Sequence, residues 1–148
     1  MHYKLNNNEV REAIKRLCAD FPSDYWQRCD KEKKYPSEFV SKLTNQGYLS
    51  TLIPEKFGGL GLPISVAAAI LEEIHRSGGN AGACHAQMYT MGTLLRHGSN
   101  DQKIKYLPKI ASGELRLQAF GVTEPNSGTD TLAVTTSAKK VNDTYIVN

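Results

Sequence analysis

Cysteine, tryptophan and long apolar runs are scarce in this sequence. Its 148 residues include three cysteines and one tryptophan. Cys18, Cys29 and Cys84 have no short ligand-like spacing, so neither a disulfide framework nor a metal site is expected, and we predict free structural thiols in a reducing compartment. The longest apolar stretches fall far short of a bilayer's width, so no membrane span is predicted.

Charge of one sign and targeting segments are also lacking. The 18 basic residues nearly balance the 15 acidic ones and are scattered, apart from a short cluster over 31–34. This balance argues against nucleic acid as a partner. Residues 1–8 lack both the apolar run of a secretory signal and the arginine-rich character of a transit peptide. A cytoplasmic protein is therefore expected, with the mitochondrial matrix left open.

Most of the chain carries helical periodicity. Apolar residues recur at spacings of three and four, between capping residues and glycine stops, and predict helices over 8–20, 23–34, 36–47, 65–77, 80–98 and 99–112. Asn8, Ser23, Ser65 and Ser99 or Asn100 are the expected N-caps. Pro108 should kink the last helix or confine it to short turns. The glycines and prolines of 48–63 predict a structured loop.

The pattern changes after Gly113. Apolar and polar residues alternate over 115–121, and 133–138 and 145–147 are rich in small or β-branched residues, so strands are predicted there. The fold class is therefore mainly α: an up-down helical domain over 1–113, followed by the first strands of a β domain over 114–148. The last strand lacks a partner in this reading, so the natural chain is expected to continue past Asn148.

The segment Thr123-Glu124-Pro125 ends a predicted strand and enters a turn rich in hydroxyls. Such a turn can hold a polar heterocycle through its hydroxyls and backbone N–H groups. Taken alone, however, Pro-Asn-Ser-Gly is a common turn composition and would be a plain connector. The motif therefore needs support from the rest of the chain.

That support comes from an ordered set of landmarks between about Tyr35 and Asn148. The sequence resembles the acyl-CoA dehydrogenase family at 54–61 (Pro-Glu-Lys-Phe-Gly-Gly-Leu-Gly), 71–74 (Leu-Glu-Glu-Ile), Gly98, 102–108, Gly113 and the motif residues Thr123, Glu124, Pro125, Gly128 and Asp130. An ordered set of this kind is far more specific than one motif. The sequence departs from the family pattern in two respects, because Thr129 replaces a serine and Asn126-Ser127 replaces smaller residues.

The resemblance implies an FAD site on the Thr-Glu-Pro corner, at the start of a β-barrel domain. Thr123 and Val122 would meet the pyrimidine edge of the flavin, and Phe120 would flank the ring or the acyl chain. Gly128 and Thr129 would lie close to the flavin phosphates, with Thr129 also near the acyl-CoA. Glu124 would stabilise the turn. The catalytic base would be a carboxylate of a later helical domain beyond Asn148, so no catalytic residue is expected in this chain.

The implied activity is the α,β-dehydrogenation of an acyl-CoA thioester to an enoyl-CoA, with FAD as hydride acceptor. Electron-transfer flavoprotein is the implied electron acceptor and a homotetramer the implied assembly, while this stretch alone should be inactive. The helix near 88–95 would form one wall of the acyl pocket, and the acyl chain length stays open. An acyl-CoA oxidase or a flavin monooxygenase-like relative is an alternative that these residues do not separate.

Other residues invite functional readings that their context does not favour. A lone His85 on an alanine-rich helix is more often structural than catalytic. Glu72 and Glu73 point about 100° apart on a helix, so they are expected to make surface or helix-packing contacts rather than act as a dyad. A non-catalytic interaction module remains a second reading, with Met88, Met91 and Leu94 facing a partner helix.

Overall fold

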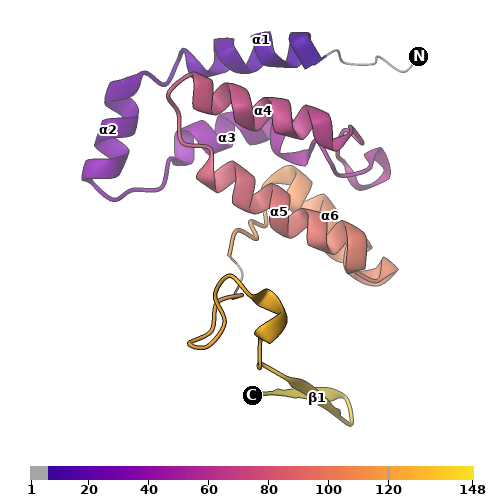
Figure 1. Ribbon diagram of the computed structural model, residues 1–148. Coiled ribbons are helices and arrows are strands. Elements are labelled where there is room, and N and C mark those ends of the chain that lie inside the picture. Colours follow the sequence, from indigo (N-terminus) through magenta and orange to yellow (C-terminus); the bar gives the residue numbers. More distant parts are fainter. Residues whose placement is uncertain (1–6, 120) are drawn as a thin grey trace.

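The computed structural model describes residues 7–119 and 121–148, and shows a helical body followed by a small hairpin (Figure 1). The helices of the body are α1 (Asn7–Cys18), α2 (Ser23–Lys31), α3 (Ser37–Asn45), α4 (Ile64–Arg76), α5 (Gly82–His97) and α6 (Asn100–Ser112). The strands are β1 (Ala138–Val141) and β2 (Thr144–Val147). The predicted mainly α fold is confirmed. Within the described ranges, no helix has the length and apolar character needed to cross a bilayer.

The six helices lie close to their predicted bounds, and the differences come from the caps. Ser23 and Ser65 are wrong as N-caps, because the prolines before each first turn hold an extended backbone and begin α2 and α4 without a side-chain cap. Asn8 likewise lies inside α1. Ser99 is confirmed as the cap of α6, because its hydroxyl accepts a hydrogen bond from the backbone N–H of Gln102 over 3.2 Å.

Helix α6 also runs unbroken through Pro108, so its confinement to short turns is wrong. A proline removes one N–H from the helix and leaves the carbonyl four residues earlier without its usual partner. Pro108 and Ile104 both lie on the exposed side of α6, where water can hydrate that carbonyl. The cost is thereby reduced, and the helix continues to Ser112.

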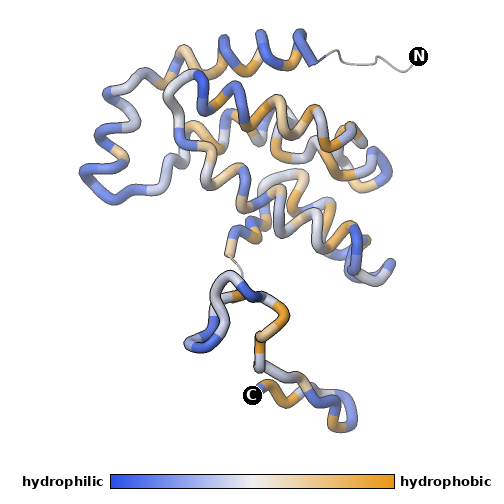
Figure 2. The backbone as a smooth tube through the Cα atoms, viewed as in Figure 1, coloured by the Kyte–Doolittle hydropathy of each residue, from blue (hydrophilic) through white to orange (hydrophobic). Residues whose placement is uncertain are grey.

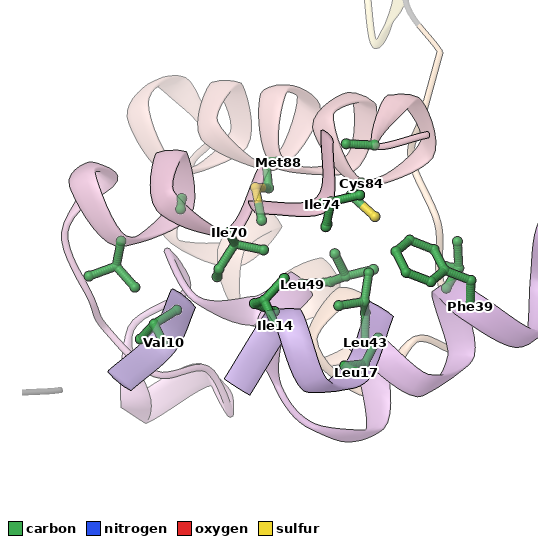
Figure 3. Close-up of a cluster of buried hydrophobic side chains, with 14 of the residues drawn as sticks. Val10, Ile14, Leu17, Phe39, Leu43, Leu49, Ile70, Ile74, Cys84 and Met88 are labelled. Atoms are coloured by element: carbon green, nitrogen blue, oxygen red, sulfur yellow. The ribbon is translucent and has the colours of Figure 1, made fainter. Parts of the chain in front are cut away.

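The core lies where α1 and α4 pack against each other and against the helices behind them. Figure 3 shows Val10 and Ile14 of α1 beside Ile70 of α4, all of which are buried. In Figure 2, the hydrophobic residues of α1 lie on the side that faces α4. Burying one such side chain contributes about 1.5 to 3 kcal/mol. This shared apolar face fixes the helices in one arrangement.

The loop over 48–63 is ordered, as predicted. It contains the short 3-10 helices η1 (Tyr48–Ser50) and η2 (Glu55–Phe57) and folds back on itself. The Leu60 amide donates to the Ser50 carbonyl over 3.2 Å, and the Gly61 amide donates to the Ile53 carbonyl over 2.8 Å. Gly59 packs against the same two carbonyls, and a Cβ atom on it would come within 2.1 Å of the Ile53 oxygen. The loop therefore packs without room for a side chain at that position.

The predicted strands are confirmed only in part. Residues 145–147 lie in β2, which pairs antiparallel with β1 in the register Ala138↔Val147 and Val141↔Thr144, so β2 has the partner that was thought missing. Strands over 115–121 and over 133–137 are wrong for the residues that the structure describes there. The alternation over 115–118 has another cause, because those side chains contact the helices rather than a neighbouring strand.

Candidate functional site

A short segment without regular secondary structure, residues 114–119, leads from α6 toward the Thr-Glu-Pro motif, and we call it the strap. It leaves α6 at Gly113, whose φ of 80° ends the helix in the left-handed region. The Leu115 amide donates back to the Lys109 carbonyl over 3.0 Å. Leu115 and Leu117 pack against the core. The strap is therefore part of the helical body.

Two polar side chains fasten the strap to α3 and α5. Arg116 donates through Nη1 to Gln87 Oε1 over 3.0 Å and through Nη2 to Thr44 Oγ1 over 2.9 Å. Gln118 donates through Nε2 to the Tyr35 hydroxyl over 2.8 Å and to the Ala83 carbonyl over 3.0 Å. These bonds join residues far apart in the sequence. They fix where the chain leaves the helical body.

The motif itself forms a tight turn, which we call the corner (residues 122–130). The Glu124 amide donates to the Ser127 carbonyl over 2.9 Å, and the Ser127 amide donates back to the Glu124 carbonyl over 3.1 Å. Ser127 is 3% exposed, and its hydroxyl donates to the Asp130 carbonyl over 2.6 Å. The serine that departs from the family pattern therefore has a defined place inside the turn.

Glu124 ties the corner to the segment before β1, in an arrangement we call the carboxylate clamp. Its Oε2 accepts hydrogen bonds from the Thr135 amide over 2.8 Å and from the Thr135 hydroxyl over 2.9 Å, while Oε1 accepts from the Thr136 amide over 2.9 Å. Hydrogen bonding from the Thr136 side chain and from both amides lowers the pKa of Glu124 to about 2. The predicted turn-stabilising role of Glu124 is confirmed.

The predicted flavin residues lie on the exposed side of this corner. Val122 is 39% exposed, and Thr123, Gly128 and Thr129 are also exposed. In Figure 1 the corner lies below α5, between the helical body and the β1–β2 hairpin. Phe120, the remaining predicted residue, lies outside the described residues. The roles assigned to all five positions stay predictions.

Gly128 offers a test of whether this corner fits an external group. Its φ does not lie in the left-handed region, and a Cβ atom built on it meets no atom within 4 Å among the described residues. Neither backbone conformation nor internal packing therefore calls for glycine here. Close approach of a ligand to the backbone is a further reason for glycine at a turn. The open space beside Gly128 leaves room for a bound group, as does the space beside Gly121.

The other candidates have structural roles. Glu72 and Glu73 of α4 both face Arg11 of α1, with N–O distances of 2.5 and 3.7 Å, so their predicted packing role is confirmed. His85 is exposed on α5, with its ring centroid 6.2 Å from that of Tyr89. No cluster of three metal-ligating side chains occurs in the described part of the chain.

The thiols and methionines also belong to the body. All three cysteines are free, as predicted, and burial raises the pKa of the Cys84 thiol to about 12. Met88 and Met91 are buried in the core, and Leu94 is half-buried against it. A partner helix on that face, the basis of the interaction-module reading, is therefore wrong because the chain covers the methionines itself.

Sequence reasoning missed the polar network around Arg116. Gln87 is only 1% exposed, and its Nε2 donates to the Leu49 carbonyl over 3.5 Å. A glutamine on the apolar face of the helix predicted over 80–98 was the available signal, since a buried amide needs partners.

Known proteins resemble the chain over nearly all of its length. The family model described as "Acyl-CoA dehydrogenase, N-terminal domain" matches residues 6–114. A 3-(aryl)acrylate reductase of Clostridium sporogenes is 36% identical over 146 residues, which is 95% of this chain and 38% of the relative. A glutaryl-CoA dehydrogenase of Desulfococcus multivorans is 36% identical over 146 residues, 95% of this chain and 36% of the relative.

A solved structure shares the fold as well. The acyl-CoA dehydrogenase of Bacillus anthracis complexed with FAD superposes with a TM-score of 0.82 at 27% identity, covering 99% of this chain and 26% of that chain. This chain thus spans little more than a third of the curated relatives described above. The family model covers well over half of the 148 residues, and the chain belongs to the acyl-CoA dehydrogenase family.

Proposed function

We propose that this chain forms the N-terminal part of a flavin-dependent acyl-CoA dehydrogenase, and that its corner forms one edge of the FAD site. The observation that carries the proposal is the ordered corner, which the carboxylate clamp holds and which exposes Val122, Thr123, Gly128 and Thr129 together. Family membership and the similarity to a dehydrogenase complexed with FAD support it.

The residues of the corner suit the edge of a flavin. Thr123 supplies a hydroxyl, and Val122 supplies backbone polar groups and an apolar side chain beside it. The open space at Gly128 admits close approach to the backbone, and Thr129 supplies a second hydroxyl. Hydrogen bonds of this kind orient a flavin and tune its electrons. Because the clamp fixes the turn in advance, these groups need little rearrangement when the cofactor binds.

FAD, when bound, would accept the hydride that leaves the β-carbon of an acyl-CoA whose α-proton is removed, giving an enoyl-CoA. The reaction requires strict alignment of the thioester with the ring. Phe120 and Thr129 are proposed to contribute to that alignment, and α5 to form one wall of the acyl pocket. Electron-transfer flavoprotein is the proposed electron acceptor, and a homotetramer the proposed assembly of the whole protein.

A second candidate keeps the same site and reverses the reaction. The 3-(aryl)acrylate reductase and the glutaryl-CoA dehydrogenase are equally similar to this chain, at 36% identity over 146 residues each. A reductase would use reduced flavin to saturate an acrylate. The same flavin edge would serve both reactions, and the residues of the corner do not distinguish between them.

The test uses the protein expressed from its complete coding sequence. We expect it to purify with FAD and, under anaerobic conditions, to lose its visible flavin absorption on addition of one member of an acyl-CoA panel. Reoxidation by electron-transfer flavoprotein but not by oxygen would distinguish the dehydrogenase from the oxidase. Bleaching by a reductant, followed by reoxidation with an aryl acrylate or its thioester, would support the reductase. A protein that binds no FAD would overturn both candidates.

A further inference from the structure

The segment after the strap, residues 121–148, has little hold on the helical body, and we call it the arm. Every hydrogen bond that the structure describes for the arm joins two of its own residues. Ser127 is its only buried residue, and it is buried within the corner. In Figure 1 the arm extends away from the helices. Among the described residues, the strap is therefore the connection between the corner and the helical body.

Arg116 is the centre of the strap's attachment. Its Nη2 binds Thr44 on α3, and its Nη1 binds Gln87 on α5. Both partners of Arg116 make further hydrogen bonds inside the body. The Thr44 hydroxyl donates to the Val40 carbonyl over 2.7 Å, and Nε2 of the Gln87 side chain donates to the Leu49 carbonyl over 3.5 Å. Arg116 thus joins the strap to α3 and α5 directly, and to η1 through Gln87.

The fit around Arg116 is close. A Cβ atom on Gly113 would lie 2.7 Å from Thr44 Cγ2 and 3.1 Å from Arg116 Nη2. Both acceptors of the guanidinium are neutral, and no carboxylate pairs with it among the described residues. An arginine at this position therefore does not serve as half of an ion pair. Its planar fork of donors suits two acceptors on different helices, which the single ammonium of a lysine does not reach together.

We propose that Arg116 is a positioning residue for the flavin site: by holding the strap on α3 and α5, it sets the orientation of the corner that carries Thr123. The inference rests on the proposed function. Its physical basis is a population shift. If the strap is docked only part of the time, the apparent dissociation constant for the cofactor equals the intrinsic one divided by the docked fraction, so affinity falls. The Gln118 bonds support the same docking from the far end of the strap.

The test compares Arg116→Met and Arg116→Lys in the protein expressed from its complete coding sequence. Methionine keeps an aliphatic stem without donors, and lysine keeps the charge without the fork. The control is Ile14→Val, which removes one methylene from the core of α1 and touches neither strap nor corner. For each protein we would measure the FAD dissociation constant, the flavin midpoint potential, thermal unfolding, and amide hydrogen exchange of residues 114–119.

We expect Arg116→Met to raise the FAD dissociation constant on the order of tenfold, the equivalent of one charged hydrogen bond. The strap amides should exchange faster in this variant, and the flavin potential should shift. Arg116→Lys keeps the positive charge, but we expect it to show the same changes in FAD affinity, strap exchange and flavin potential as Arg116→Met. Ile14→Val should unfold at a lower temperature while leaving FAD affinity and potential unchanged.

The remaining outcomes separate this inference from the proposed function on which it rests. If the unmodified protein binds FAD and the arginine variants match its affinity and potential, the positioning role is overturned while the flavin site stands. Restoration by lysine would also overturn it, because charge alone would then suffice. If the unmodified protein binds no FAD, the proposed function itself fails. If Arg116→Met is too unstable to purify, hydrogen exchange of the strap amides in Arg116→Lys decides. Faster exchange than in the unmodified protein supports the positioning role, and unchanged exchange overturns it.

Discussion

Replacing Gly59 with alanine should destabilise the helical body strongly. The added Cβ atom would lie 2.1 Å from the Ile53 carbonyl oxygen and 2.6 Å from the Ser50 carbonyl oxygen. Those oxygens already accept hydrogen bonds from the Gly61 and Leu60 amides. The obstructing atoms are backbone, so no side-chain rotation relieves the clash. The loop must shift, and with it η1, whose Leu49 carbonyl accepts from Gln87.

Overpacking of this kind costs about 3 kcal/mol when the neighbours cannot move aside. For a chain of this size that cost lowers the melting temperature by roughly 10 °C. The matched control is Gly92→Ala on α5, where a Cβ atom meets nothing within 4 Å. Alanine is the better helix former, so this change should stabilise the protein by about 1 kcal/mol. Thermal unfolding followed by circular dichroism measures both, and equal effects of the two substitutions would refute the reasoning.

Three further predictions address the corner, the thiols and the cap of α6. The carboxylate clamp lowers the pKa of Glu124 to about 2 from its ordinary value of 4.5. The clamp therefore stabilises the fold above pH 4.5, and this stabilisation is lost as the pH falls toward 2. A titration of the Glu124 carboxyl by NMR with a midpoint near 4.5 would contradict this prediction. A thiol reagent should modify Cys29 in the folded protein and leave Cys84 unmodified until unfolding, which mass spectrometry detects. Ser99→Ala should cost about 1 kcal/mol in chemical denaturation, and no change would argue against the capping box.

The helices were predictable because their signals are local. Apolar residues at spacings of three and four place Val10, Ile14 and Leu17 on one face of α1 without reference to the rest of the chain. The loop over 48–63 was equally clear from its glycines and prolines. Caps were less predictable, since Pro22 starts α2 one residue earlier than a Ser23 cap would, and Pro63 starts α4 two residues earlier than a Ser65 cap would.

The strap shows why the remaining features were not predictable. Alternation over 115–121 satisfies the strand pattern, yet Arg116 and Gln118 use that alternation to reach polar groups on α3 and α5. Their partners lie between 29 and 83 residues away in the sequence, and periodicity carries no information about contacts at that distance. The corner was recognisable only through its resemblance to a family, because its turn composition is common.

The most direct measurement of the central claim compares Thr123→Val with Thr131→Val in the protein expressed from its complete coding sequence. Both changes remove one hydroxyl from an exposed threonine of the arm, and Thr131 lies in η3 (Thr131–Ala133), outside the proposed contact. If the corner holds the flavin, Thr123→Val should weaken FAD binding roughly tenfold and slow flavin reduction by acyl-CoA, while Thr131→Val behaves as the unmodified protein. Equal FAD affinity and equal reduction rates in all three proteins would contradict the account.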